Sequence, residues 1–254
     1  MHDFRVVRND KLSDDYYVLV LECPQELPEV LPGQFAELRV DHSPATYLRR
    51  PFSIYNVDSK ANTLSLLIKK VGEGTRALGK LKEGDALNLV YPLGNTFSDP
   101  SGDEALLVGG GVGIAPMLLL AKSLSAKGKI VDVLIGGRSR TDILEPHLYE
   151  PFARNVYITT DDGSAGEHGM VTGHSIFRKD ALNYSMICAC GPDPMMKAVA
   201  AIAHSKGIPC EVSLENLMAC GIGACLCCIV ETRHGNKTSC VEGPVFNTSN
   251  LTGW

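Results

Sequence analysis

Residues 105–128, ALLVGGGVGIAPMLLLAKSLSAKG, decide which class of fold this chain adopts. An apolar run of strand length leads through three consecutive glycines into a segment of helix length. A strand that ends in glycines and continues directly into a helix offers main-chain N–H groups and the positive end of the helix dipole to a phosphate. The stretch therefore predicts a nucleotide-binding α/β unit. A glycine-rich turn without any ligand is the alternative.

The residues that follow repeat this alternation. Strand-like runs are found at 131–137, 155–160 and 184–191, and helical segments are expected at 141–152 and 194–207. Strands that alternate with helices predict a doubly wound parallel sheet. We therefore expect an α/β domain over residues 99–210.

Residues 1–98 have a different texture, in which short strand-like runs are separated by turns. The runs are YYVLVLEC (16–23), GQFAELRV (33–40), FSIYNV (52–57), TLSLLIKKV (63–71) and DALNLVYP (85–92). Regularly spaced runs of this kind predict a small antiparallel β-barrel or sandwich. With the α/β domain and an appended segment at 211–254, the chain is expected to be an α+β protein of three parts.

Composition and charge limit the classes of function. The chain has 254 residues, of which 44% are hydrophobic and 21% charged, as is usual for a globular protein with a large core. A net charge of −5 without any basic run predicts no nucleic-acid partner. No apolar run reaches the roughly 18 residues of a membrane helix, and the N-terminal residues lack the apolar core of a signal peptide. We therefore expect a cytoplasmic protein that has no membrane partner.

The segment ACGIGACLCCIVETRHGNKTSC (219–240) contains five of the nine cysteines. In a reducing compartment, thiols at this density favour metal binding or reactivity over disulfides. Three of them follow the pattern C-x4-C-x2-C, and a fourth comes after 11 further residues, a spacing that resembles the plant-type ferredoxin arrangement around a [2Fe-2S] cluster. The expected ligands are Cys220, Cys225, Cys228 and Cys240.

Small residues separate the first two of these cysteines. Gly221, Gly223 and Ala224 allow backbone angles that larger side chains would block, so that N–H groups can point at the sulfur atoms. Zinc is the alternative metal, although zinc sites usually pair two C-x2-C units. The C-x2-C register favours Cys228 as the ligand and leaves Cys227 as a small packing residue.

Two segments of the first domain resemble the FAD site of the ferredoxin-reductase family. Its R-x-[YF]-S signature is matched by Arg50, Pro51, Phe52 and Ser53, and its glycine-rich turn by Gly74 and Thr75 in IKKVGEGTRAL (68–78). In that family the arginine pairs with the pyrophosphate, the aromatic ring packs along the cofactor, and the serine binds near the isoalloxazine ring. The resemblance also implies FAD contacts from Leu67, Ile68 and Lys69. Read alone, RRPFS could be a surface arginine pair before a strand.

The α/β domain resembles the same family. Gly111, Gly113 and Pro116 lack the last glycine of the common dinucleotide fingerprint but match the family's G-x-G-x-A-P version. CACGPDPMM (188–196) resembles the family's nicotinamide-side loop, and the resemblance implies that NAD is bound by Gly110, Gly111, Gly113, Pro116, Cys190 and Gly191. Arg138 and Arg140 could hold the 2′-phosphate of NADP or be solvated loop charges, and the resemblance favours NAD.

The order of the three parts, with SLENLMACGIGACLCCIV (213–230) and CVEGPVF (240–246), resembles the electron-transfer subunits of NAD-dependent dihydroorotate dehydrogenase. This resemblance covers nearly the whole chain. Leu217 and Cys227 depart from the family's usual residues, but neither is an expected ligand. The resemblance implies a partner subunit that carries FMN and oxidises dihydroorotate for pyrimidine synthesis, in a heterotetramer with two copies of each chain.

The cofactors determine the expected mechanism. NAD exchanges a hydride and an iron–sulfur cluster a single electron, so FAD, which can do both, must lie between them. No catalytic acid, base or metal hydroxide is expected in this chain. Two alternatives are a subunit of another flavin iron–sulfur complex, such as a ferredoxin:NADP oxidoreductase or hydrogenase-linked reductase, and a non-enzymatic redox sensor that binds zinc and a nucleotide.

Overall fold

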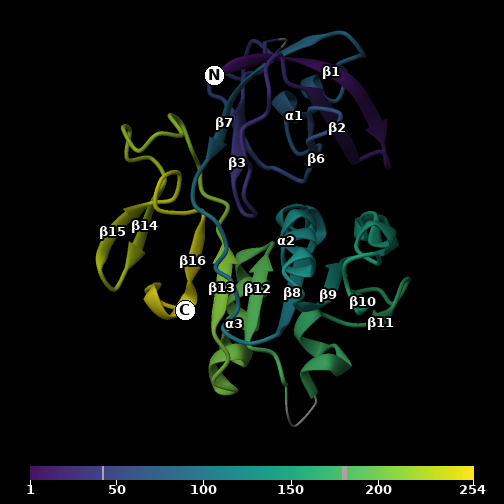
Figure 1. Ribbon diagram of the computed structural model, residues 1–254, viewed down its shortest axis with the longest axis vertical. Coiled ribbons are helices and arrows are strands. Elements are labelled where there is room, and N and C mark those ends of the chain that lie inside the picture. Colours follow the sequence, from purple (N-terminus) through teal and green to yellow (C-terminus); the bar gives the residue numbers. More distant parts are fainter. Residues whose placement is uncertain (42, 179–181) are drawn as a thin grey trace.

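The computed structural model describes residues 1–41, 43–178 and 182–254. Figure 1 shows the N-terminal β domain above the α/β domain, with a C-terminal module beside both. The seven N-terminal strands form one antiparallel sheet in the order β4-β3-β7-β1-β2-β6-β5. They are β1 His2–Lys11, β2 Tyr16–Glu22, β3 Phe35–Leu38, β4 Arg50–Ser53, β5 Asn56–Asp58, β6 Thr63–Lys69 and β7 Ala86–Leu93.

The connection between β4 and β5 draws the two ends of this sheet together. Ile54 N–H donates to the carbonyl of Gln34 on the β3 side (3.0 Å), and Tyr55 N–H donates to that of Ser65 in β6 (2.9 Å). The sheet therefore curls into the barrel that the sequence predicts. The short helix α1, Glu73–Leu78, follows β6.

Strand β1 was not expected from the sequence. Its polar residues obscure a regular alternation, in which Phe4 and Val6 enter the barrel core while Asp3 and Arg5 stay exposed. In β3 the same alternation sends Ala36 and Leu38 into that core. The opposite face of β3 is buried as well, because the C-terminal module covers it.

The second sheet has the order β11-β10-β9-β8-β12-β13-β16. Its strands are β8 Glu104–Gly110, β9 Ile130–Gly137, β10 Asn155–Thr160, β11 Glu167–His168, β12 Met186–Cys190, β13 Cys210–Ser213 and β16 Val245–Asn247. The first six run parallel, and β16 is antiparallel to β13.

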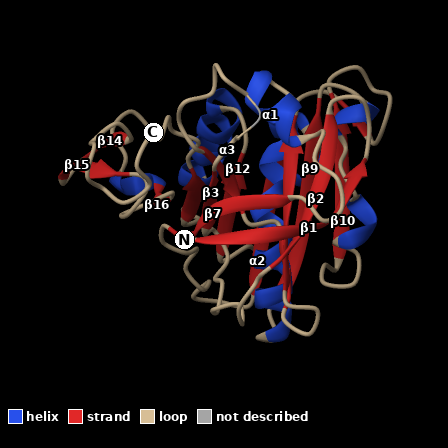
Figure 2. Ribbon diagram, turned by 90° about the horizontal axis from the view of Figure 1, so that it is seen from above, coloured by secondary structure: helices blue, strands red, loops and turns tan. Residues whose placement is uncertain are grey.

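Two helices, α2 Ala115–Ala126 and α3 Asp193–Ser205, cover opposite faces of this sheet (Figure 2). In β8, Leu107 packs on the α2 side and Leu106 on the α3 side, which explains why the strand reads as an unbroken apolar run. The predicted doubly wound domain is confirmed. The remaining helical turns are 3-10 segments at Gly111–Ile114, Arg140–Asp142, Pro146–Leu148, Val171–Gly173, Ser175–Arg178 and Thr248–Asn250.

The helix predicted at residues 141–152 is wrong. The segment contains the end of one 3-10 turn and a second short one, and Glu145 between them adopts a left-handed φ of +43°. Pro146 gives the reason, since a proline disfavours the α conformation in the residue before it.

The C-terminal module lies between β13 and β16. The predicted boundary at 210/211 falls inside β13, and β16, within the range 211–254, pairs with β13 of the α/β sheet. The module itself holds the cysteine loop and the hairpin of β14 Ile229–Thr232 and β15 Gly235–Thr238. Among the described residues, no helix has both the length and the apolar character that crossing a membrane requires.

Candidate cofactor sites

A cavity of about 490 Å³ lies where the barrel meets the carboxyl ends of the central parallel strands. Tyr16 and Lys69 enter it from the barrel, Gly191 from the loop after β12, and Glu215 from the start of the C-terminal module. Ligands of open α/β sheets bind at this edge. All three parts of the chain therefore contribute to one site.

The two glycine turns predicted to bind NAD are in contact with each other at the cavity wall. A Cβ atom on Gly113 would lie 2.6 Å from the Cys190 carbonyl oxygen and 2.6 Å from the Cα of Gly191. One on Gly110 would lie 2.6 Å from the sulfur of Met195. Gly111 has a φ of +54° and also lines the cavity. The glycines thus allow the two turns to pack closely against each other, while the space beside Gly111 stays open to the cavity.

Two predicted NAD residues do not line this cavity. Pro116 is buried in the first turn of α2, where it needs no hydrogen bond from its nitrogen. Cys190 is 1% exposed, and burial raises the pKa of its thiol well above the usual range. Glu215, which the sequence did not single out, does line the cavity, where desolvation by the surrounding walls and the charge of Asp193 raise its pKa.

A hydrogen bond joins the barrel to the α/β domain at this cavity. The Tyr16 hydroxyl donates to Asp142 Oδ1 (2.6 Å), Lys69 Nζ lies 3.9 Å from the same oxygen, and Arg138 N–H donates to Oδ2 (3.1 Å). Burial alone would raise the pKa of Asp142, but these neighbours hold it below its usual range. The Arg140 side chain instead donates to the carbonyl of Ser164, so Arg138 is the arginine of this pair that lines the cavity.

The two segments predicted to bind FAD meet at the edge of the barrel. A Cβ atom on Gly74 would lie 3.7 Å from Arg50 Nε. Among the described residues, the half-buried guanidinium of Arg50 has no hydrogen-bond or ion-pair partner. An unpaired cation beside a glycine turn fits an anion such as a pyrophosphate. Thr75 is engaged within its own turn, since its Oγ1 accepts from the N–H of Val71 (2.9 Å).

Among the other residues predicted to bind FAD, some could contact it only through main-chain groups and others through their side chains. Leu67 and Ile68 are buried in apolar cores, so only their main-chain groups could contact a cofactor. Strand β6 pairs with β5 no further than Ser65, so no described strand pairs with that edge of β6 beyond it. The side chains that are partly exposed, and so open to a ligand, are those of Pro51, Phe52, Ser53 and Lys69.

The cysteine loop is shaped by glycines with positive φ, as its small residues predict. Gly221 and Gly223 have φ values of +68° and +78°. The N–H of Gly223 donates to Cys240 Sγ (3.1 Å), and that of Cys225 donates to Cys220 Sγ (3.4 Å). Main-chain donors thus point at sulfur atoms, which stabilises thiolates.

The four predicted ligands form two neighbouring pairs. The N–H groups of Ile222 and Cys225, with the Cys225 thiol, lower the pKa of Cys220 to about 7. Burial and the adjacent Cys228 thiol raise the pKa of Cys240 to about 11. Cys227 is exposed, so its predicted role as a packing residue is wrong; the turn around Leu226, with a φ of +57°, directs it outward.

This donor set fits a [2Fe-2S] cluster. Buried side-chain polar atoms without a hydrogen-bond partner are rare in proteins. In the described part of the chain there are three, Glu37 Oε1, Glu37 Oε2 and Ser239 Oγ, and all three flank the cysteines. No three His, Cys, Asp or Glu side chains of the described residues are grouped to hold a single ion. A [2Fe-2S] cluster takes four thiolates, two on each iron, and the two pairs of thiols could supply them.

Comparison with protein families assigns each part of the chain. Residues 3–97 match the oxidoreductase FAD-binding domain, residues 107–201 the oxidoreductase NAD-binding domain, and residues 215–252 the iron-sulfur cluster binding domain of dihydroorotate dehydrogenase B. The chain therefore contains an FAD-binding, an NAD-binding and an iron–sulfur domain.

Curated relatives match along nearly their whole length. The protein named "Dihydroorotate dehydrogenase B (NAD(+)), electron transfer subunit" in Clostridium acetobutylicum is 40% identical over 250 residues, 97% of this chain and 95% of that one. The protein of the same name in Caldanaerobacter subterraneus subsp. tengcongensis is 37% identical over 246 residues, 95% and 94% of the two chains. These names describe one subunit of an enzyme that also has a catalytic partner.

A solved structure of an NADH-dependent reduced ferredoxin-NADP oxidoreductase is also similar. It aligns with a TM-score of 0.88 and 31% identity, over 98% of this chain and 89% of that one. This solved structure shares the fold of the chain. The family match at residues 215–252 and the curated relatives are more specific, because all of them name dihydroorotate dehydrogenase B. This chain belongs to the family of electron transfer subunits of NAD-dependent dihydroorotate dehydrogenase B.

Proposed function

We propose that this chain passes electrons from an FMN-containing, dihydroorotate-oxidising partner subunit through a [2Fe-2S] cluster and FAD to NAD. The observation that carries this proposal is that one cavity takes walls from the barrel, the α/β domain and the module. Redox groups bound by the three parts would be neighbours, as electron transfer requires.

The barrel and the α/β domain bind and orient the two nucleotides in this proposal. Arg50 holds the FAD pyrophosphate beside Gly74, and Ser53 with the free edge of β6 orients the flavin. FAD, when bound, converts between hydride and single-electron transfer. Gly110, Gly111 and Gly113 present main-chain groups to the NAD phosphates, and Gly191 leaves room for the nicotinamide. The buried Cys190 thiol packs behind this wall.

We assign the cofactor as NAD because of the charges at the cavity. Asp161 lines it and would repel a 2′-phosphate, Arg138 is paired with Asp142, and Arg140 is engaged with Ser164. The nine cysteines of the chain are unpaired, which supports a reducing, cytoplasmic location.

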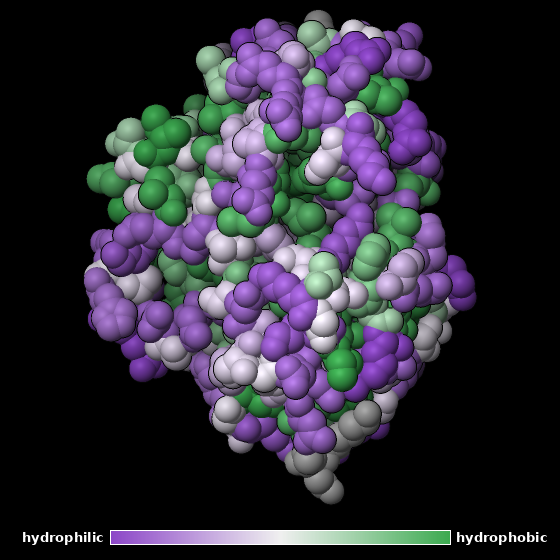
Figure 3. All heavy atoms as spheres, in the orientation of Figure 1, coloured by the Kyte–Doolittle hydropathy of each residue, from purple (hydrophilic) through white to green (hydrophobic). Residues whose placement is uncertain are grey.

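The partner is proposed to cover the rim of the cysteine loop. Figure 3 shows apolar side chains gathered over the module, at the left of the molecule. Leu217 is 85% exposed, and Ile222, Leu226 and Val241 are exposed around the same loop. Exposed apolar groups of this kind mark protein contacts. We propose that the FMN subunit binds here, in an assembly with two copies of each chain.

A second candidate function follows from the solved relative. Its TM-score of 0.88 and 31% identity favour a subunit of a ferredoxin-NADP oxidoreductase as the alternative. The two functions differ in the partner and in the electron donor.

Anaerobic purification is the test. We expect one FAD, about two irons and two acid-labile sulfides per chain. With an FMN subunit from the same cell, dihydroorotate should reduce NAD. A protein that binds zinc in place of iron, or a complete complex that reduces NAD only with ferredoxin, would contradict the proposal.

A further inference from the structure

Glu37 is a buried acid to which the sequence assigns no role. It lies in the middle of β3 and is 0% exposed. Neither carboxyl oxygen has a hydrogen-bond partner among the described residues. A buried carboxylate without a partner costs several kcal/mol, so proteins retain one only where another group compensates.

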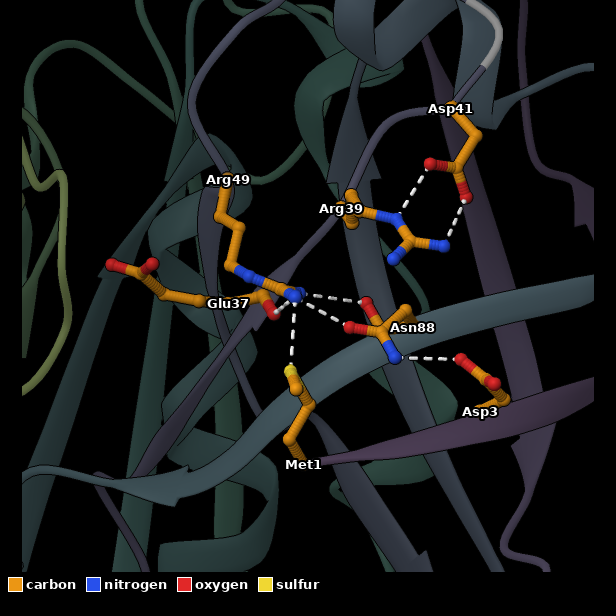
Figure 4. A network of polar contacts seen from close by, with 7 residues as sticks. All are labelled: Met1, Asp3, Glu37, Arg39, Asp41, Arg49 and Asn88. Carbon is orange, nitrogen blue, oxygen red and sulfur yellow. Dashed lines mark hydrogen bonds and ion pairs between the residues drawn. The ribbon is translucent and has the colours of Figure 1, made fainter.

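The nearest cation does not pair with this carboxyl group. Arg49 donates to the main-chain carbonyl of Glu37 (3.3 Å) and to the main-chain and side-chain oxygens of Asn88. Asn88 is in turn fixed by Asp3, to which it donates (2.6 Å). Figure 4 shows the Glu37 carboxyl group pointing away from the guanidinium of Arg49. Burial raises its pKa, and the charge of Arg49 opposes this only in part.

The carboxyl group points at the cysteine loop. A Cβ atom on Gly221 would lie 3.0 Å from Glu37 Cδ and 3.1 Å from its Oε1. Gly221 therefore provides the room into which the carboxyl group fits, directly beside Cys220. Phe35, on the same face of β3, packs with Cys228 and Cys240. This face of the strand is thus the floor of the iron–sulfur site.

The strand that carries Glu37 is also paired with the FAD segment. Glu37 is paired with Pro51 of β4, between Arg50 and Phe52. The β3–β4 ladder therefore carries the predicted FAD signature on one strand and the cluster-facing carboxyl group on the other. Because side chains alternate along a strand, those of Arg50 and Phe52 lie on the face of the sheet opposite to that of Glu37.

We propose that Glu37 is a positioning residue of the iron–sulfur site, whose carboxyl group reaches past Gly221 and supplies the bound cluster with a hydrogen bond. This rests on the proposed function only in requiring a cluster at the four cysteines. A protonated carboxyl group donates to sulfur, and reduction adds one negative charge to the cluster. The hydrogen bond therefore stabilises the reduced form more than the oxidised form and raises the reduction potential.

The test is a redox titration of the cluster, followed by electron paramagnetic resonance, in the FAD-loaded chain. Glu37→Leu removes the donor at similar volume, and we expect the one-electron equilibrium to shift about tenfold toward the oxidised form, or 59 mV lower. Glu37→Gln keeps an N–H donor of the same shape and should stay close to wild type. Glu22→Leu, on β2 and paired with Arg5, is the matched control and should leave the potential unchanged.

Iron and FAD contents separate the outcomes. The proposal is overturned if Glu37→Leu binds iron and FAD fully and its cluster keeps the wild-type reduction potential. It is also overturned if the potential shifts equally in the Leu and Gln variants. Loss of iron with FAD retained in Glu37→Leu, but full loading of Glu37→Gln, supports it. If Glu37→Leu binds neither cofactor, the Glu37→Asp variant is measured in its place, because its shorter side chain withdraws the donor from the cluster. An unchanged reduction potential of the cluster in Glu37→Asp then overturns the proposal. Wild-type protein without iron would instead refute the proposed function.

Discussion

Single charged residues of this protein differ in whether another group of the folded chain pairs with their charge. Arg39 pairs with Asp41 through two hydrogen bonds, whereas Arg50, at the next strand, has no described partner. Both occur in polar stretches of a β domain, and sequence alone separates them only through the motif around Arg50. A charge that the folded chain leaves unpaired near a glycine turn is best explained by a ligand.

Arg50→Ala should therefore weaken FAD binding without weakening the fold. We expect a loss of about 1.5–3 kcal/mol in FAD binding, the range for a hydrogen bond to a charged group. The melting temperature of the FAD-free protein should not change, because Arg50 contacts no described charge. Fluorescence titration with FAD measures the first effect and calorimetry the second. Arg39→Ala should keep wild-type affinity; an equal loss there would show a general charge effect.

Gly113→Ala tests the contact between the two glycine turns. The added methyl group would lie 2.6 Å from main-chain atoms of Cys190 and Gly191, which no rotamer change can relieve. We expect the free energy of unfolding to fall by about 1–3 kcal/mol and NAD binding to be lost. Urea unfolding and NAD titration measure these effects. Gly173→Ala, where no atom lies within 4 Å, is the control, and similar losses in both variants would contradict this interpretation.

Glu37 shows why some site residues could not be predicted. In GQFAELRV the acid alternates with apolar residues, the pattern of a strand with one solvated face. The pattern correctly predicts the strand, but it wrongly predicts that the face with Glu37 is exposed to solvent. A segment some 180 residues later in the chain covers that face. Tyr16 and Asp142 escaped notice for the same reason: they are 126 positions apart and form a site only across the domain boundary.

Among the elements, the strand–helix units were predicted well because the apolar periodicity of each segment determines its secondary structure without contacts to distant parts of the chain. The glycine run and α2 lie where the periodicity places them. The segment 141–152 failed because its apolar spacing suits a helix, while Pro146 and the left-handed Glu145 prevent one. The expected boundary at 210/211 divides β13, whose hydrogen bonds with β12 place the strand in the α/β sheet.

Strand β9 carries a buried acid that links its neighbours. Asp132 accepts hydrogen bonds from Arg154, from Tyr184 (2.6 Å) and from Asn155 (3.0 Å). Burial alone would raise its pKa, but these donors hold it below the ordinary value of 3.8. A depressed carboxylate pKa contributes stability that is present above the unfolded pKa and is lost as the pH falls through the folded one.

Asp132→Asn should therefore cost about 1–3 kcal/mol of unfolding free energy at pH 7, because buried donors lose their charged acceptor. The difference from wild type should persist down to about pH 4 and shrink below it, as wild-type Asp132 takes up its proton. Urea unfolding at pH 7, 5 and 3.5 measures this. Asp103→Asn, an exposed acid near the same strand ends, should show little change at any pH. A difference that stays constant across these pH values would exclude the ionic role of Asp132.

In the whole molecule, the barrel and the α/β domain share one apolar core. Tyr16, Val18 and Leu67 of the barrel belong to the same cluster as Leu107 and Met117 of the α/β domain. The composition of each half predicts its own fold but not this shared core, because either half alone would leave these residues exposed. The nucleotide cavity therefore lies between two domains that are packed against each other. This packing fixes the distance between FAD bound to one domain and NAD bound to the other.

Besides its packing on β3, the C-terminal module is held to the barrel by polar contacts from a single residue. The Asn95 side chain donates to the carbonyls of Glu242 and Val245 (2.8 Å each) and accepts from the N–H of Val245 (2.9 Å). These bonds connect the loop after β7 to the strand that returns from the cysteines. Asn95 thus couples the position of the iron–sulfur site to that of the barrel.

Asn95→Ala should loosen the module while leaving FAD binding unchanged. Removing three hydrogen bonds, two of them to the partly buried main chain of Val245, should cost about 1–3 kcal/mol, so a chelator should release iron about tenfold faster or more. Exchange of the Val245 amide hydrogen should accelerate with it, since that N–H loses its acceptor. Asn183→Ala, at an exposed loop position, is the control. Iron release at the wild-type rate, with rapid Val245 exchange, would mean that the cluster is held by the cysteine loop independently of its attachment to the barrel.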